Sequence, residues 1–331
     1  DHAFHLRHAQ ALTLLIFRHE AGARDSLSGS PGPDLVSQFG HCAKKRQSGV
    51  SCNAIDQLSR EILMRIGFIG TGAMAQAIAR GAVASGVDPA TLVFSNRTAA
   101  KACDFADELG ATAASSNASL ARQADIIILA VKPKDQRAVV KEISPIVVGR
   151  PDVCVVSLAA GRTLDQITTD FGAGIPLVRV MPNVAATVGQ SMTALTASRA
   201  TDAQVDAVRS LMESVGRTIL IDEDYFPVFQ ALASCSPAWY FQIIDTFARA
   251  GLKYGLSKDS AVEIAAQAMA GAATLLLAER EAGTIPAQLI DRVTSPGGTT
   301  IAGLLAAEEG GLSNALVGAV DASIHADSHL G

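Results

Sequence analysis

From Arg65 onward the chain alternates short apolar runs with amphipathic stretches. Continuous apolar runs of this length are typical of strands buried on both faces of a sheet, and they are found at 66–69, 91–94, 126–131, 153–158 and 177–180. Helical periodicity lies between them, at 73–85, 99–109, 119–123, 135–143 and 164–170. This order predicts a parallel, doubly wound α/β sheet with right-handed crossovers.

After about Asp222 no further strand is predicted. The rest of the chain shows helical patterns at 237–254, 258–282, 286–293, 299–308 and 312–326. We therefore expect two folded domains, an α/β domain over 64–224 and an all-helical domain over 225–331. The stretch 261–278 is apolar on nearly every face, although Glu263, Gln267 and many small alanines argue against a membrane span. An apolar helix in a small domain needs a cover, which predicts a homodimer or higher homo-oligomer.

Residues 1–63 differ from the rest of the chain, because they mix charges with Ser, Gly and Pro and lack sustained periodicity. The first methionine is Met64, directly before the regular pattern, and we expect residues 1–63 to have no role in catalysis. Their apolar run at 11–17 is too short to span a bilayer, and their acidic residues argue against an organelle transit peptide. We expect a cytoplasmic protein with no membrane association.

Composition then excludes several functions. The 331 residues carry 27 Lys and Arg against 32 Asp and Glu, and a net charge of −5 provides no basic field for nucleic acid. The five cysteines show no disulfide or metal-binding spacing, so no metal is expected. No histidine lies between residues 42 and 324, which disfavours any mechanism that needs an imidazole base in the folded core.

A dinucleotide-binding motif follows the first predicted strand. Gly70-Thr71-Gly72-Ala73-Met74-Ala75 fits G-x-G-x-x-A and opens a helix, which is the context that gives the motif its mechanism. Gly70 permits the tight turn, Gly72 lets the backbone approach a pyrophosphate, and Ala75 permits close packing of helix on strand. The N-terminus of the helix then offers free N–H groups to the phosphates. The pattern predicts a Rossmann-like fold.

The end of the second strand indicates which dinucleotide is bound. NAD-binding domains place an acidic residue here, whereas this chain has Ser95, Asn96 and Arg97. A guanidinium pairs with a ribose 2′-phosphate, so NADPH is the expected cofactor and NADH a weaker substitute. The alternative is that Arg97 is an ordinary solvated side chain.

Two further segments are expected at the same edge of the sheet. Ala130, Val131, Lys132 and Pro133 lie at and just after the end of the predicted strand 126–131, and Asn117 should border the same crevice. Lys132 either contacts the cofactor or lies on the surface, and the sequence does not decide between the two.

In the helical part, one loop combines glycines with hydroxyl groups directly before a helix. It reads Thr294-Ser295-Pro296-Gly297-Gly298-Thr299-Thr300, and such a loop can direct several donors at a carboxylate. The simpler alternative is a Ser or Thr helix cap with a flexible lead-in.

Four motifs resemble those of the pyrroline-5-carboxylate reductase family, and the resemblance covers residues 65 to 325. They are Gly67-Phe68-Ile69-Gly70-Thr71-Gly72-Ala73-Met74, Leu129-Ala130-Val131-Lys132-Pro133-Lys134, Arg179-Val180-Met181-Pro182-Asn183 and Val293-Thr294-Ser295-Pro296-Gly297-Gly298-Thr299-Thr300. A Glu309-Gly310-Gly311 turn follows, as it does in the family.

The resemblance implies NADPH-dependent reduction of the cyclic imine 1-pyrroline-5-carboxylate to L-proline, the last step of proline biosynthesis. It implies that Ser295, Gly297, Gly298 and Thr299 hold the substrate carboxylate and that Thr300 lies beside the imine nitrogen. It also implies dimers with intertwined helical domains. The missing histidine fits this chemistry, because a protonated imine already carries its proton and needs positioning more than a strong acid.

The chain departs from the family at Ser234-Cys235-Ser236-Pro237-Ala238-Trp239, where the family pattern is Gly-Ser-Gly-Pro-Ala-Tyr. Ser236 with Pro237 still predicts a helix start, and Cys235 is expected to be a packed thiol rather than a nucleophile. The change leaves open the reduction of another cyclic imine acid. The sequence is also compatible with a beta-hydroxyacid dehydrogenase that uses Lys253 and with an NADPH-binding regulator without activity.

Overall fold

The computed structural model describes residues 64–327, so the expectation for residues 1–63 lies outside the described residues. Its first part is one sheet of eight strands in the order β3-β2-β1-β4-β5-β6-β7-β8. The strands are β1 (Ile66–Ile69), β2 (Leu92–Ser95), β3 (Thr112–Ala113), β4 (Ile126–Leu129), β5 (Cys154–Ser157), β6 (Leu177–Met181), β7 (Ser191–Ser198) and β8 (Gly216–Leu220). The first six in this order run parallel, as the apolar runs predict.

The far edge of the sheet differs from the prediction of a wholly parallel sheet. Strand β7 runs antiparallel to β6, and β8 runs parallel to β7, so the sheet is mixed. The hydrophobic pattern predicts no strand at β7 or β8. Neither has a continuous apolar run, because β7 contains buried Ser191 and Thr193 and β8 is largely exposed.

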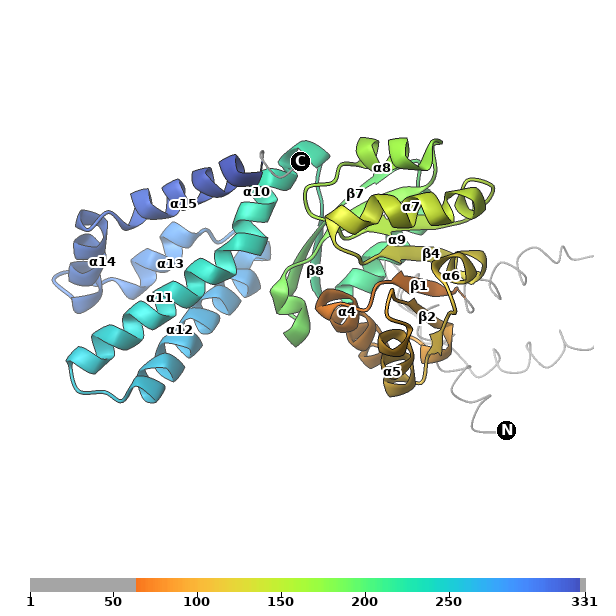
Figure 1. Cartoon of the computed structure of the whole chain (residues 1–331). Coiled ribbons are helices and arrows are strands. Elements are labelled where there is room, and N and C mark those ends of the chain that lie inside the picture. The colour runs from red at the N-terminus through yellow and green to blue at the C-terminus, as the bar shows by residue number, and fades with distance from the viewer. Residues whose placement is uncertain (1–63, 328–331) are drawn as a thin grey trace, which may run out of the picture. The chain divides into compact units, whose positions relative to one another are not determined.

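Helices cover both faces of this sheet (Figure 1). One core forms under α4 (Ala73–Ala84), α5 (Ala99–Leu109) and α9 (Asp202–Glu213), and it contains the stacked rings of Phe68 and Phe94, 5.3 Å apart. The other forms under α6 (Asn117–Gln123), α7 (Pro133–Val147) and α8 (Leu164–Phe171). The predicted Rossmann-like fold is confirmed, with one helix, α9, that is not among the predicted elements.

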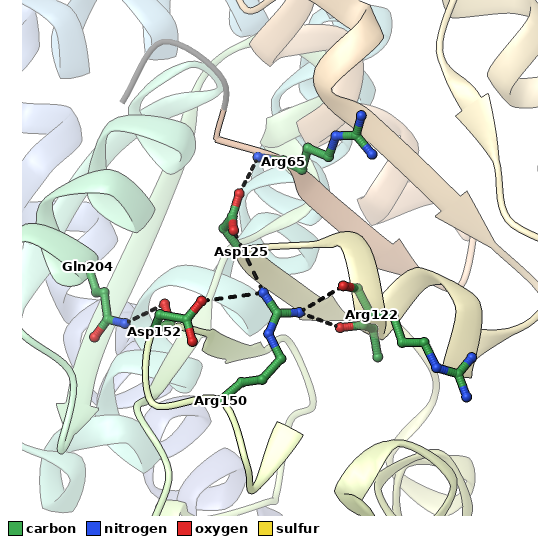
Figure 2. A network of polar contacts seen from close by, with 7 residues as sticks. Arg65, Arg122, Asp125, Arg150, Asp152 and Gln204 are labelled. Carbon is green, nitrogen blue, oxygen red and sulfur yellow. Dashed lines mark hydrogen bonds and ion pairs between the residues drawn. The ribbon is translucent and has the colours of Figure 1, made fainter. Parts of the chain in front are cut away.

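A polar network joins the sheet at the opposite end from the glycine-rich turn (Figure 2). Arg150 donates to the carbonyls of Ala121 and Arg122 at the end of α6 and forms ion pairs with Asp125 and Asp152. Asp125 also accepts from the backbone N–H of Arg65, at 2.8 Å. Since these residues precede β1, β4 and β5, the network fixes the amino ends of the three strands relative to α6.

The second part of the chain is helical, as predicted. It contains a short helix α10 (Phe226–Phe229), a π-helical segment (Gln230–Cys235), and the helices α11 (Ser236–Lys253), α12 (Lys258–Glu279), α13 (Pro286–Val293), α14 (Thr299–Glu309) and α15 (Leu312–Asp327). Of the residues in α12, Ala261 alone is buried, and none of those in α13, α14 or α15 is buried in the single chain. The described stretch Lys258–Ala282 is long and apolar enough to cross a membrane by length and composition, which is weak evidence for a span.

A helix, α11, begins at Ser236 as predicted, but the prediction that Ser236 is its N-cap is wrong. Cys235 and Ser236 both have right-handed helical backbone angles, so the chain turns continuously from α10 through the π-helical segment into α11. The Ser236 hydroxyl donates backward to the carbonyl of Leu232, at 2.6 Å, instead of accepting from an N–H ahead of it. Pro237 is therefore the second residue of α11, and the chain directly before α11 is already helical.

Candidate functional site

The glycine-rich turn after β1 lies between the carboxyl ends of β2 and β4. Gly70 has a φ of +102°, and its N–H donates to the carbonyl of Ser95 at 2.8 Å. A Cβ on Gly70 would lie 2.8 Å from the carbonyl oxygen of Ala130. Both the backbone angle and the close approach therefore require glycine at this position.

The turn leads into a helix end with unused donors. Gly72 is the N-cap of α4 and no side chain caps the helix, while the first turn contains no acidic residue. A Cβ on Gly72 would meet nothing within 4 Å, so the backbone faces open space. Ala73 and Met74 continue the turn, and Ala75 is buried against the sheet as predicted. Exposed N–H groups at a helix N-terminus form an anion site, and a pyrophosphate fits this one.

Thr71 adds an unsatisfied polar group to the same turn. Its N–H donates to Asn96 Oδ1 at 3.4 Å, and the residue is 6% exposed. Its Oγ1 is buried and has no hydrogen-bond partner among the residues that the structure describes. Buried hydroxyls are normally paired, so this atom is a further sign that the turn accommodates a bound group.

The end of β2 carries the three residues that predict the choice of dinucleotide. Ser95 is buried, and its hydroxyl donates to Asn117 Oδ1 at 2.8 Å. The amide of Asn117 in turn donates to Glu142 Oε2 on α7, at 2.7 Å. Arg97 is exposed and forms no hydrogen bond or ion pair within 64–327, which leaves its guanidinium available. The predicted site does not include Glu142. No local pattern indicates it, because it lies 25 residues from Asn117 in sequence.

The segment after β4 completes this edge. The N–H of Ala130 donates to the carbonyl of Ile69 at 2.9 Å, and Val131 lies next to the turn at Gly70. Lys132 is the N-cap of α7 and is exposed, while Pro133 begins the helix. The structure thus brings the predicted cofactor residues that follow β1, β2 and β4 together at one edge of the sheet.

The Arg179 to Asn183 motif connects the sheet to the helical part. Arg179 is 5% exposed, forms an ion pair with Glu223 at 2.8 Å and lies 4.2 Å from the centre of the Phe226 ring. Glu223 also accepts from the N–H of Leu164 at the start of α8, at 2.9 Å. The motif marks the family in the sequence, but nothing near it predicts Glu223, which is 44 residues away.

A groove of about 790 Å³ lies between the loop after β6, strand β8 and the continuous helical stretch from α10 through the π-helical segment into α11. Its walls are mostly apolar. The lining residues are Asn183, Val184, Ala185, Thr187, Val188, Gln190, Met192, Ile219, Phe229, Leu232, Ala233, Ser236, Pro237, Tyr240 and Phe241. Of the segment that departs from the family pattern, Ser236 and Pro237 line the groove, whereas Ser234, Cys235 and Trp239 do not.

The hydroxyl-rich loop lies before α14 and is shaped by its two glycines. Gly297 has a φ of +69°, and a Cβ on Gly298 would overlap the hydroxyl of Ser295. Gly298 is the N-cap and no side chain caps the helix, so the alternative of a Ser or Thr cap does not hold. Thr299 and Thr300 are exposed, and neither hydroxyl is bonded within the described residues. The loop therefore presents free donors, as a carboxylate site requires.

This loop is not joined to the cofactor residues by any hydrogen bond within 64–327. Its bonds are local, such as the one from Gly298 N–H to the carbonyl of Ser295 at 2.9 Å. The predicted cofactor residues and the predicted substrate loop are thus two separate groups, and no hydrogen bond or ion pair between residues of the described part of the chain connects them.

Lys253 and Cys235, which the sequence singles out, are placed without a chemical role, and so is the buried Cys154. Lys253 lies in the last turn of α11, with its ammonium 5.6 Å from the centre of the Tyr254 ring. Cys235 is a half-buried free thiol in the π-helical segment. Burial raises the pKa of the Cys154 thiol to about 12, so this cysteine is unreactive at neutral pH.

The sheet with its glycine-rich turn defines a dinucleotide-dependent oxidoreductase domain. Residues 65–161 match the family described as "NADP oxidoreductase coenzyme F420-dependent", and residues 223–330 match "Pyrroline-5-carboxylate reductase dimerisation". A pyrroline-5-carboxylate reductase of Glycine max is 36% identical over 264 residues, which are 78% of this chain and 93% of the relative. The chain belongs to the pyrroline-5-carboxylate reductase family.

Solved structures agree with this assignment. The structure of a pyrroline-5-carboxylate reductase from Coxiella burnetii superposes with a TM-score of 0.77 at 32% identity, and the match covers 81% of this chain and 99% of that chain. Plasmodium falciparum pyrroline carboxylate reductase, solved with NADP bound, gives a TM-score of 0.69 at 25% identity, over 81% and 98% of the two chains.

Proposed function

We propose that the protein reduces 1-pyrroline-5-carboxylate to L-proline with NADPH, the last step of proline biosynthesis. One observation carries the proposal: relatives with this activity in their names match the chain over more than nine-tenths of their own length, at 32 to 36% identity. The turn at Gly70 and the loop at Ser295 support it, because each leads into a helix whose first N–H groups no side chain caps.

The residues at the carboxyl edge of the sheet would hold NADPH. Gly70, Thr71, Gly72, Ala73 and Met74 would contact the pyrophosphate, because the start of α4 offers uncapped N–H groups. Around them, the proposed contacts are Ser95, Asn96, Arg97, Asn117, Ala130, Val131, Lys132 and Pro133. Arg97 would pair with the 2′-phosphate, since its guanidinium has no carboxylate partner within 64–327. When bound, the cofactor supplies a hydride.

The loop before α14 would hold the substrate. Ser295, Gly297, Gly298 and Thr299 would bind its carboxylate with hydroxyl and backbone donors, and Thr300 would orient the imine nitrogen. The hydride adds to the imine carbon, and the electron pair of the C=N bond moves to a nitrogen that is already protonated. No strong general acid is needed, which suits a chain without histidine between residues 42 and 324.

The exposed apolar helices support a homodimer or a higher homo-oligomer formed through the helical part. Large side chains such as Ile264 (58% exposed) and Val317 (61% exposed) project from α12 and α15 of the single chain. A second copy of this surface would cover them, and this also explains an apolar α12 without a membrane. In this proposal 64–224 is the cofactor domain, 225–331 is the substrate and dimerisation domain, and the enzyme is cytoplasmic, with no nucleic-acid or membrane partner.

The assay that tests the proposal follows NADPH oxidation with 1-pyrroline-5-carboxylate, beside NADH and beside 3-hydroxy acids with NADP. We expect turnover with the pyrroline and none with the hydroxy acids. Tight NADPH binding without turnover would overturn the proposed substrate and favour another cyclic imine acid or a regulator without activity.

Arg97 has its own test. We expect Arg97→Ala to lower the preference for NADPH over NADH by about tenfold or more, because a charge-assisted contact with the 2′-phosphate is lost. Arg122→Ala, at another exposed arginine, is the matched control and should keep the wild-type preference. An unchanged ratio of the two Michaelis constants in Arg97→Ala would contradict the assignment.

Thr300 is tested by separating turnover from cofactor binding. We expect Thr300→Ala to lower kcat by about ten- to a hundredfold, because the imine is less well oriented, while the Kd for NADPH stays the same. Thr300→Ser keeps the hydroxyl and should restore most of the activity. Equal turnover in Thr300→Ala and the wild type would reject the role.

A further inference from the structure

Pro237 removes a backbone donor close to the start of α11. In an α-helix the N–H of residue 237 would bond to the carbonyl of Ala233, and in a π-helix it would bond to the carbonyl of Leu232. Proline has no N–H, so neither bond can form. The Ser236 N–H bonds to Ala231 O, five residues back, so the missing N–H of residue 237 could have served either the carbonyl of Leu232 or that of Ala233.

Side chains donate to both of these carbonyls. The Ser236 hydroxyl donates to Leu232 O at 2.6 Å, a bond within the helix. The Asn183 amide donates from Nδ2 to Ala233 O at 2.8 Å, although the two residues are 50 apart in sequence. Ala233 is 9% exposed, so loss of this donor would leave a largely buried carbonyl unpaired.

Asn183 is itself held firmly in the loop after β6. Its N–H donates to Ser191 Oγ at 3.1 Å, and its Oδ1 accepts from the N–H of Ala185 at 3.1 Å. Ser191 Oγ lies 3.1 Å from Thr193 Oγ1, and both hydroxyls are buried in β7. Since Oδ1 faces a donor and Nδ2 faces an acceptor, the amide has one orientation.

The residues that make this contact lie in the wall of the groove, which includes Asn183, Ala233, Ser236 and Pro237. We propose that Asn183 is a positioning residue of the reductase: its amide makes the hydrogen bond that Pro237 cannot make and thereby fixes the first turn of α11 against the loop after β6. The kinetic part of this inference rests on the proposed function. The structural part does not.

A double-mutant cycle tests the structural part by thermal unfolding at fixed protein concentration. Asn183→Ala should lower the Tm by about 3–8 °C, because a largely buried carbonyl loses its partner. In a Pro237→Ala background residue 237 has an N–H, which in the α-helical register bonds to Ala233 O, so on this inference Asn183→Ala should lower the Tm by less than half as much. Equal losses in the two backgrounds would overturn the inference, whether or not the proposed activity is found.

One further variant, and the recovery of folded protein as a second readout, make the cycle decisive. Asn183→Asp keeps the acceptor for the Ala185 N–H but places an oxygen against Ala233 O, so it should be at least as damaging as Asn183→Ala; wild-type stability would contradict the inference. If Asn183→Ala does not fold, recovery of folded protein in the double variant supports the pairing. Failure of the double variant, when Pro237→Ala alone folds, overturns it.

Kinetics separate positioning from stability alone. Measured well below the Tm, Asn183→Ala should raise the KM for 1-pyrroline-5-carboxylate about tenfold and leave the KM for NADPH within about twofold, and Pro237→Ala should partly restore it. Thr246→Val is the control, because the Thr246 hydroxyl makes a similar bond to Gln242 O within α11 but no proline is involved. It should leave both constants unchanged. A Tm cycle as expected with an unchanged KM for the imine would leave Asn183 as a structural residue and reject its positioning role.

Discussion

The helices α4 and α12 are both rich in alanine, yet the apolar face of α4 is buried and that of α12 is exposed. In α4, Ala75, Ala77, Ile78, Ala79 and Ala82 are buried against the sheet. In α12, which is longer, Ala261 alone is buried, while Ile264 and Leu275 are 58% and 44% exposed. The cofactor part buries its apolar side chains within the chain. The helical part leaves its apolar side chains exposed, so another surface must cover them.

This difference indicates that the two parts are stabilised differently. The cofactor part has a core on each face of its sheet, so it needs no partner to bury its strands. For α12 to α15, the helical pairing within one chain cannot exclude water from the apolar side chains. We therefore expect the assembly state to affect the helical part strongly and the cofactor part little.

The largest effect is expected from a charge placed on the exposed apolar face of α12, which tests whether this face needs a partner. We expect Ile264→Glu to yield a monomer in light scattering and to lower activity by about a hundredfold or more, because it would place a carboxylate in an apolar interface. Gln267→Glu adds the same charge at a polar position of the same helix and should leave the assembly intact. If the two variants behave alike, the exposed apolar face of α12 is not an interface.

The contrast also shows why the fold of the cofactor part could be predicted in most detail. Strands β1, β4 and β5 are continuous apolar runs, and their burial on both faces leaves one interpretation. Strand β7 could not be found in this way, because its buried Ser191 and Thr193 hydroxyls are paired with each other rather than replaced by apolar side chains. Strand β8 is an exposed edge and carries little apolar signal.

The site follows the same rule. The turn at Gly70 and the loop at Ser295 are local, so their residue types alone predict donors for an anion, although for the loop they also allow a Ser or Thr cap. The polar contacts around these segments join residues that are distant in sequence, such as Asn117 with Glu142 and Arg179 with Glu223. No local pattern marks such pairs, because each partner is an ordinary polar residue until the fold brings the two together.

A smaller effect is expected from the polar network at the amino ends of the strands (Figure 2). Arg150→Ala removes two bonds to carbonyls at the end of α6 and two ion pairs, and its side chain is 26% exposed. We expect a loss of about 1–3 kcal/mol in the free energy of unfolding by urea. The Michaelis constants should not change, because the network lies at the other end of the strands from the cofactor turn.

Arg80→Ala is the control for this measurement. Arg80 pairs with Glu108 on the surface, where both side chains are about half exposed, at 48% and 50%. Solvent screens such a pair, so we expect a clearly smaller loss than for Arg150→Ala. Equal losses in the two arginine variants would mean that the network of Figure 2 adds nothing to an ordinary surface pair.

The smallest expected effect lies in the polar contacts of the helical part. Asp245 on α11 bonds to Lys258 at 2.5 Å and to Arg249 at 2.6 Å. The Lys258 ammonium and then the Arg249 guanidinium lower the pKa of this carboxyl below its usual 3.8. The stabilisation is therefore fully present above the unfolded-state pKa and is lost as the pH falls through the lower folded-state value.

Asp245→Asn should accordingly lower the Tm by about 1–2 °C at pH 7, since the groups are exposed, and the difference from the wild type should vanish at about pH 2. Asp291→Asn is the matched control, because the Asp291 carboxylate forms no ion pair within 64–327. A difference for Asp245→Asn that stays constant with pH would mean that the charge of Asp245 does not stabilise the fold. With the expected pH dependence, the contact between α11 and the start of α12 would be one that a single chain of the helical part makes without a partner, which sharpens the contrast with its uncovered apolar faces.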